Sequence, residues 1–199
     1  TLFRSINCIS GVLRTDGGRL RFGDREITAL PTHQRTRLGI ARSFQIPKPF
    51  TSMTVQENLC IPLAYTATDH RQRDGVESEA MDILRLIGLE SKARVYASRL
   101  TLVELRKLEL ARAMAARPRL LISDEAMAGL SSNEVDEILD ILTALNERGI
   151  TIIMIEHIMR AVMRFSQRIV VLDAGQVIAA GNPEEIVSNP AVEKAYLGV

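Results

Sequence analysis

Two adjacent carboxylates at the end of an apolar run are the residues of this chain best suited to chemistry. Leu120, Leu121 and Ile122 have the character of a central parallel strand, and Asp124 and Glu125 follow. Open α/β sheets bind ligands at the carboxyl ends of their strands. In phosphoryl transfer one such acid helps to hold Mg²⁺, and a neighbouring carboxylate orients or deprotonates the attacking water. The pattern equally fits a solvated strand end, because polar residues gather where strands leave the core.

Two other predicted strands also end in polar side chains. The run at 40–44 is followed by Gln45, and the run at 150–155, which we expect to be buried on both faces, is followed by Glu156 and His157. Taken alone, Gln45 fits an ordinary loop glutamine and His157 fits a hydrogen-bonded histidine at a strand end. With Asp124, three predicted strands therefore end in polar side chains of the kind that line a nucleotide site.

The elements that must position these residues follow from hydrophobic periodicity and capping signals. Thr54 with Glu57 and Ser131 with Glu134 fit capping boxes at helix starts. Strands that alternate with helices indicate a parallel sheet. We expect helices at 1–9, after Pro31, at 54–63, 77–87, 104–115, after Ser131, at 158–165 and after Asn182. The helix after Ser131 has an apolar stripe of Val135, Ile138, Leu139, Leu142 and Leu145. Hairpin strands are expected within 17–28 and at 169–172 and 176–179.

The composition excludes several classes of protein. The 199 residues are 46% hydrophobic and 25% charged, as in a globular domain with a sizeable core. A net charge of +1 gives no reason to expect a nucleic-acid partner. No apolar run is long enough to cross a bilayer, so a link to a membrane is expected to be peripheral. Cys8 and Cys60 lack metal-type spacing and are expected to be reduced thiols.

In this order and context, the motifs resemble those of the ATP-binding subunits of ABC transporters over essentially the whole chain. Asp124 and Glu125 look like the magnesium-side acid and the catalytic carboxylate that end the Walker B strand. The segment 128–131 is similar to the D-loop, and His157 to the switch histidine that senses the γ-phosphate. Gln45 is similar to the Q-loop glutamine, which lies between the catalytic sheet and a helical subdomain.

The resemblance implies one α/β domain of the P-loop NTPase-like (ABC ATPase) type over residues 1–199. It has a mostly parallel sheet, an antiparallel β hairpin and an inserted helical subdomain at about 46–116. It also implies that the protein binds ATP and Mg²⁺, with Asp124 and Gln45 binding the metal. Thr1, Thr101 and Ser131 are then expected at the nucleotide, and Glu125 and His157 are the expected catalytic residues.

Two motifs depart from the family pattern. Where the signature reads Leu-Ser-Gly-Gly-Gln, residues 100–104 read Leu-Thr-Leu-Val-Glu, so Thr101 keeps a hydroxyl but both glycines are lost. The alternative is a core-packing role for Leu102 and Val103. The phosphate-binding Gly-x-x-x-x-Gly-Lys-Ser/Thr loop is absent from the 199 residues, and 1–3 resemble the residues just past it. We therefore expect a domain without its N-terminal strands and Walker A loop. Alone, this domain is expected to bind ATP weakly or not at all and to be inactive as an ATPase.

Within the family, the greater likeness is to subunits that energise the uptake of branched-chain amino acids. The segments 41–45, 53–58, 155–163 and 195–198 carry it. It implies transport of branched-chain amino acids or similar small amides, with permease subunits, a second ATP-binding subunit in a homo- or heterodimer, and indirectly a periplasmic solute-binding protein as partners. The expected location is peripheral, on the cytoplasmic face of the inner (plasma) membrane.

Two other functions fit parts of the pattern. A non-hydrolysing regulatory or interaction module would keep the fold without its phosphate loop. A soluble ABC-type ATPase acting on nucleic acid would share the motifs, but the near-neutral charge and the absence of a long coiled-coil insertion weigh against it.

Overall fold

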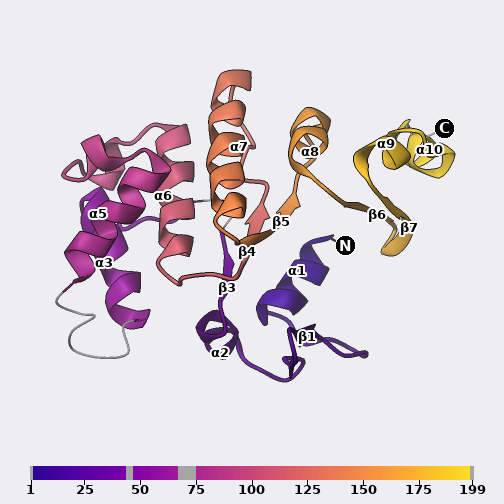
Figure 1. The fold of residues 1–199 in the computed structure, drawn as a ribbon, viewed down its shortest axis with the longest axis horizontal. Helices are drawn as coiled ribbons and strands as arrows, with labels where there is room; N and C mark the ends of the chain where they lie inside the picture. The colour runs from indigo at the N-terminus through magenta and orange to yellow at the C-terminus, as the bar shows by residue number, and fades with distance from the viewer. Residues whose placement is uncertain (1, 44–46, 67–74, 198–199) are drawn as a thin grey trace.

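A three-stranded parallel sheet lies at the centre of the protein (Figure 1). The computed structural model describes residues 2–43, 47–66 and 75–197. Strand β3 (Ile40–Arg42) pairs with β4 (Leu120–Asp124), and β4 pairs with β5 (Thr151–Ile155). In this register Arg42 lies opposite Ile122, and Asp124 lies opposite Ile155. The carboxyl ends of the strands therefore meet at one edge, as the sequence predicts.

Strand β4 is buried along its whole length because each of its faces covers a different core. Side chains alternate across a strand, so Leu121 joins one cluster while Leu120 and Ile122 join the other. The larger cluster includes the predicted stripe of helix α7 (Ser132–Glu147), all of whose five members are buried. The smaller cluster brings Ile6 and Ile27 against the opposite face.

The expectation that the strand at 150–155 is buried on both faces is wrong. Thr151 is exposed, and the remaining residues of β5 are only half-buried. The physical reason is its place at the edge of the sheet, where β4 is its one strand neighbour within the described residues. A run of Ile and Met therefore indicated strand character correctly but overstated the burial.

A group of helices lies beside the sheet, at the left of Figure 1. It contains α3 (Val55–Thr66), α5 (Val76–Ile87) and α6 (Leu102–Met114), with short 3-10 helices at Glu90–Lys92 and Ala97–Arg99. Their buried side chains, such as Leu59, Leu84 and Leu108, belong to the larger core. These helices fall within 46–116, the range predicted for the helical subdomain, whose boundaries remain a prediction.

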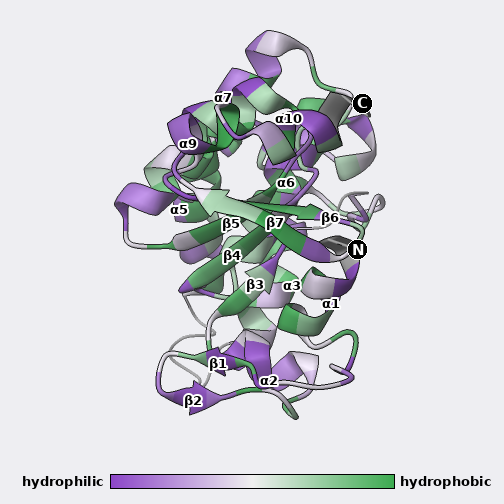
Figure 2. Cartoon of the chain, turned by 90° about the vertical axis from the view of Figure 1, so that its right-hand side faces the viewer, coloured by the Kyte–Doolittle hydropathy of each residue, from purple (hydrophilic) through white to green (hydrophobic). Residues whose placement is uncertain are grey.

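The remaining elements are two hairpins and several short helices. The hairpin of β1 (Arg21–Phe22) and β2 (Arg25–Glu26) is antiparallel, as predicted, and Figure 2 shows it as largely hydrophilic beside the apolar central strands. Strands β6 (Ile169–Asp173) and β7 (Gln176–Gly181) form the second hairpin. The other helices are α1 (Leu2–Ser10), α2 (Thr32–Arg37), α8 (Met159–Phe165), α9 (Pro183–Val187) and α10 (Pro190–Leu197).

Capping boxes set the start of several helices. The Thr54 hydroxyl accepts from the Glu57 N–H while the Glu57 carboxylate accepts from the Thr54 N–H, and Ser131 with Glu134 repeats the pattern, as predicted. Helix α6 starts at Leu102, two residues before the expected start, because Thr101 and Glu104 form a further capping box. In the part of the chain that the structure describes, no helix combines the length and apolarity needed to span a bilayer.

Candidate nucleotide and metal site

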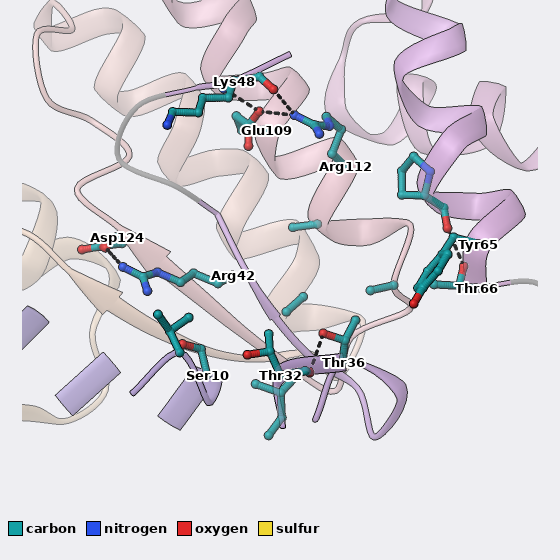
Figure 3. A pocket seen from close by; sticks show the side chains of 16 residues that line it. Ser10, Thr32, Thr36, Arg42, Lys48, Tyr65, Thr66, Glu109, Arg112 and Asp124 are labelled. Atoms are coloured by element: carbon teal, nitrogen blue, oxygen red, sulfur yellow. Dashed lines mark hydrogen bonds and ion pairs between the residues drawn. The ribbon is translucent and has the colours of Figure 1, made fainter. Parts of the chain in front are cut away.

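The side chain of Asp124 is completely buried at the carboxyl end of β4 and forms an ion pair with Arg42 of β3 (Figure 3). Arg42 Nη2 lies 2.6 Å from Asp124 Oδ2, and Arg42 Nη1 lies 2.6 Å from Asn7 Oδ1 of helix α1. The second carboxylate oxygen, Asp124 Oδ1, is buried and has no hydrogen-bond partner within the described residues. Arg42 therefore neutralises one oxygen of this carboxylate, and the other oxygen has no hydrogen bond within the described residues.

This leftover oxygen fits a hard divalent cation. A buried polar atom without a partner costs free energy, so an unmade bond in a folded protein calls for an explanation. Mg²⁺ takes oxygen ligands and is commonly held by one or two carboxylates together with substrate phosphates. The described residues contain no group of three or more His, Cys, Asp or Glu side chains that would hold a metal unaided. Asp124 would accordingly supply one ligand and a nucleotide would supply others.

Glu125 adopts an unusual backbone conformation next to the end of β5. Its φ is +46°, in the left-handed region that side-chain-bearing residues rarely occupy. The Glu125 N–H donates to the Ile155 carbonyl at 3.0 Å, which joins the end of β4 to the end of β5. The half-buried Glu125 is thereby held near the segment that carries the exposed His157. Strained residues of this kind cluster at active sites, which motivates the assignment of Glu125 as catalytic.

Glu156 is a half-buried acid to which the sequence pattern assigned no role. Its Oε1 accepts a hydrogen bond from the Met127 N–H at 3.0 Å, and its Oε2 is buried without a partner in the described residues. Burial raises the pKa of the Glu156 carboxyl above its ordinary value, Glu125 raises it further, and the Met127 N–H and His157 act in the opposite direction. The one signal in the sequence was an acid between an apolar strand and a histidine.

We expect the substitution Glu156→Gln to make the protein more stable at neutral pH and less sensitive to pH. The raised pKa means that the native state binds the Glu156 proton more tightly than the unfolded state does. Stability from this group is therefore full at low pH and is lost as the pH rises through the raised native pKa. Urea unfolding between pH 4 and pH 8, with exposed Glu147→Gln as the control, measures the difference. A steeper pH dependence in Glu156→Gln would contradict this reasoning.

The structure gives Thr101 and Ser131 roles as helix caps. The Thr101 hydroxyl accepts from the Glu104 N–H at 3.4 Å, and the Ser131 hydroxyl donates to Glu134 Oε2 at 2.7 Å. Both residues are exposed, so their predicted contacts with nucleotide remain predictions. Leu102 is 43% exposed, which makes the core-packing alternative wrong for this residue.

Val103, the other residue of that alternative, is half-buried and packs against the larger core. The segment that resembles the signature lies beside the one that resembles the D-loop. A Cβ placed on Gly129 would be 3.4 Å from Leu102 Cδ2, and Arg106 Nη2 donates to the Ala128 carbonyl at 3.2 Å. Two other predicted site residues, Thr1 and Gln45, lie outside the described residues.

A cavity of about 570 Å³ opens beside the Arg42–Asp124 pair (Figure 3). On its other side, Arg112 Nη1 donates to Glu109 Oε1 at 2.7 Å and to the Lys48 carbonyl at 2.9 Å. The bond to the Lys48 carbonyl attaches residues 47–50 to helix α6. The Phe50 ring lies 5.4 Å from the Arg112 guanidinium, and Phe50 is 42% exposed.

Comparison with known protein families shows which family the chain belongs to. Residues 4–128 match the family model described as ABC transporter. The chain belongs to the ABC transporter family as an ATP-binding subunit. Residues 176–199 match a second model, described as branched-chain amino acid ATP-binding cassette transporter. The α/β, P-loop NTPase-like fold predicted from the sequence is confirmed by the solved structures described below.

Curated ABC relatives are similar over most of the chain. The high-affinity branched-chain amino acid transport ATP-binding proteins LivG of Salmonella typhimurium and BraF of Pseudomonas aeruginosa are each 37% identical over 205 residues, which cover 96% of this chain and 80% of theirs. A probable LivG of Archaeoglobus fulgidus is 36% identical over 202 residues, covering 97% of this chain and 79% of its own.

Solved ABC structures share the fold. The ADP conformation of MJ1267, an ATP-binding cassette of an ABC transporter, aligns with a TM-score of 0.87 at 28% identity and covers 99% of this chain and 83% of that one. The cbiO1 protein of Clostridium perfringens, described as part of the ABC transporter complex cbiONQ, aligns with a TM-score of 0.84 at 25% identity, covering 98% and 78%.

Proposed function

We propose that these residues form the ATP-hydrolysing part of a subunit that energises uptake of branched-chain amino acids or similar small amides. The observation that carries the proposal is the edge of the sheet. There the buried Asp124 has one unpartnered carboxylate oxygen, and the strained Glu125 is bonded to the strand that leads to His157. The identity of 37% to LivG and BraF and the match over 176–199 support the transported class.

In this proposal each polar residue has a separate task. Asp124 and Gln45 would bind Mg²⁺, which would neutralise charge on the phosphates. Glu125 orients or deprotonates the water that attacks the γ-phosphate, while His157 contacts that phosphate. Hydrolysis then depends on positioning and charge neutralisation, without a covalent intermediate.

The remaining site residues and the partners belong to the assembled transporter. Thr101 and Ser131 would contact nucleotide between two ATP-binding subunits, in a homo- or heterodimer. Gln45 and the loop 47–50, attached to α6 through Arg112, would transmit the closing motion to permease subunits at the cytoplasmic face of the inner (plasma) membrane. A periplasmic solute-binding protein would deliver the solute to the permease. The alternative of a non-hydrolysing module has no support from the LivG and BraF relatives described above, which are named as branched-chain amino acid transport ATP-binding proteins.

Nucleotide binding tests the proposal. Calorimetry is run on the 199 residues alone and on a form that carries a phosphate-binding loop ahead of Thr1. We expect weak ATP binding or none for the 199 residues, because backbone N–H groups of that loop and its lysine supply the main phosphate contacts. The extended form is expected to bind ATP and to hydrolyse it with Mg²⁺. Saturable micromolar binding by the 199 residues would refute the first expectation, and an extended form without hydrolysis would refute the function.

A further inference from the structure

One guanidinium group joins three elements of the candidate site. Arg42 ends strand β3, bonds Asp124 at the end of β4 and bonds Asn7 on helix α1. Its side chain is 10% exposed, and that of Asp124 is 0% exposed. Ile40 and Arg42 lie on the same face of β3, as Ile122 and Asp124 do on β4, because side chains two apart share a face. Ile40 and Ile122 pack in the core cluster that includes Ile6 of helix α1.

We propose that Arg42 is a positioning residue that orients Asp124 for a divalent cation. The inference rests on the proposed function of this edge of the sheet. Arg42 occupies Asp124 Oδ2 and leaves Oδ1 as the oxygen available to the metal. Asn7 holds the other half of the guanidinium fork and so fixes the direction from which Arg42 approaches.

The chemistry of arginine suits this task. Its guanidinium is planar and always charged, so it binds two acceptors in a fixed geometry. A charge-assisted hydrogen bond of 2.6 Å in a buried site holds the carboxylate more firmly than a neutral donor would. Groups that orient a metal ligand typically change metal affinity about 10–100-fold when they are removed. Arg42 would thus affect the metal without touching it.

The contact between Arg42 and Asn7 distinguishes orientation of Asp124 from a role in which Arg42 only competes with the metal for that carboxylate. If Arg42 only replaced a missing cation, its removal would free both oxygens of Asp124 and tighten metal binding. If Arg42 orients the carboxylate, its removal leaves a buried acid free to rotate and weakens metal binding. The fork shared with Asn7 favours orientation, because a competing cation has no need of a second fixed partner.

The test measures how nucleotide binding depends on Mg²⁺ in the form that carries a phosphate-binding loop ahead of Thr1. A fluorescent, non-hydrolysable ATP analogue is titrated at a series of Mg²⁺ concentrations, so the readout is binding and not activity. Arg42→Met is expected to raise the half-saturating Mg²⁺ concentration by roughly tenfold or more, and Asn7→Ala by a smaller factor. Arg85→Met, which removes an exposed ion-pair partner on α5, is the matched control.

Each outcome decides the matter. An unchanged or lower half-saturating Mg²⁺ concentration in Arg42→Met overturns the proposal. Should circular dichroism show that this variant does not fold, Asn7→Ala decides in its place, since it leaves the ion pair itself intact. If the unaltered protein shows no Mg²⁺-dependent binding, the proposed function fails and this inference fails with it. Mg²⁺-dependent binding that is the same in all variants overturns the role of Arg42 alone.

Discussion

Replacing Glu125 by glutamine is expected to slow ATP hydrolysis by roughly 10²–10⁴-fold, the usual contribution of a general base. Glutamine has nearly the same shape as glutamate but cannot accept the proton of the attacking water. The backbone bond from the residue 125 N–H to the Ile155 carbonyl does not involve the side chain, so the local fold should persist. ATP binding is therefore expected to remain while turnover is lost.

The measurement is phosphate release under saturating ATP and Mg²⁺, with ATP binding followed in parallel, on the form that carries a phosphate-binding loop. Glu147→Gln, an exposed substitution on helix α7, is the control and should leave turnover unchanged. Glu125→Gln with more than about a tenth of normal turnover would mean that another group activates the water. Loss of ATP binding would instead point to a structural role for Glu125.

Truncating Leu142 to alanine is expected to lower the free energy of unfolding by about 2–5 kcal/mol. Leu142 is 0% exposed and packs in the larger core with Ile138 and Leu145 of the same helix. Removing its buried methyl groups loses their transfer free energy and leaves a cavity, because the surrounding helices relax only in part. Helix α7 follows Ser131, so this loss of packing would also loosen the loop after Glu125.

Urea denaturation followed by circular dichroism measures this change, and the midpoint should fall without a change in the slope. Exposed Glu147→Ala on the same helix is the control, with an expected effect within about 0.5 kcal/mol. A loss of less than about 1 kcal/mol in Leu142→Ala would show that the core collapses around the truncated side chain. It would then argue against rigid packing between α7 and β5.

Local chemistry accounts for the features that were predictable from sequence. Alternation between apolar strands and amphipathic helices identified the sheet, and the stripe of α7 was predicted in full because each buried position follows from a period of 3.6 residues. The capping signals at Thr54 and Ser131 were predictable for the same reason, since donor and acceptor lie three residues apart. Asp124 is predictable because it ends an apolar strand.

The strands, most helix starts, the family and the acids at the end of β4 can all be predicted from the order of the residues. The groups that these acids contact depend instead on how the strands and helices pack together. Arg42 and Asp124 are 82 residues apart in the chain, and Glu156 and Met127 are 29 apart. Periodicity cannot predict such pairs, because they depend on which strands become neighbours and on their register. The edge position of β5, which limits its burial, has the same origin: a strand's own residues do not specify how many neighbours the sheet provides.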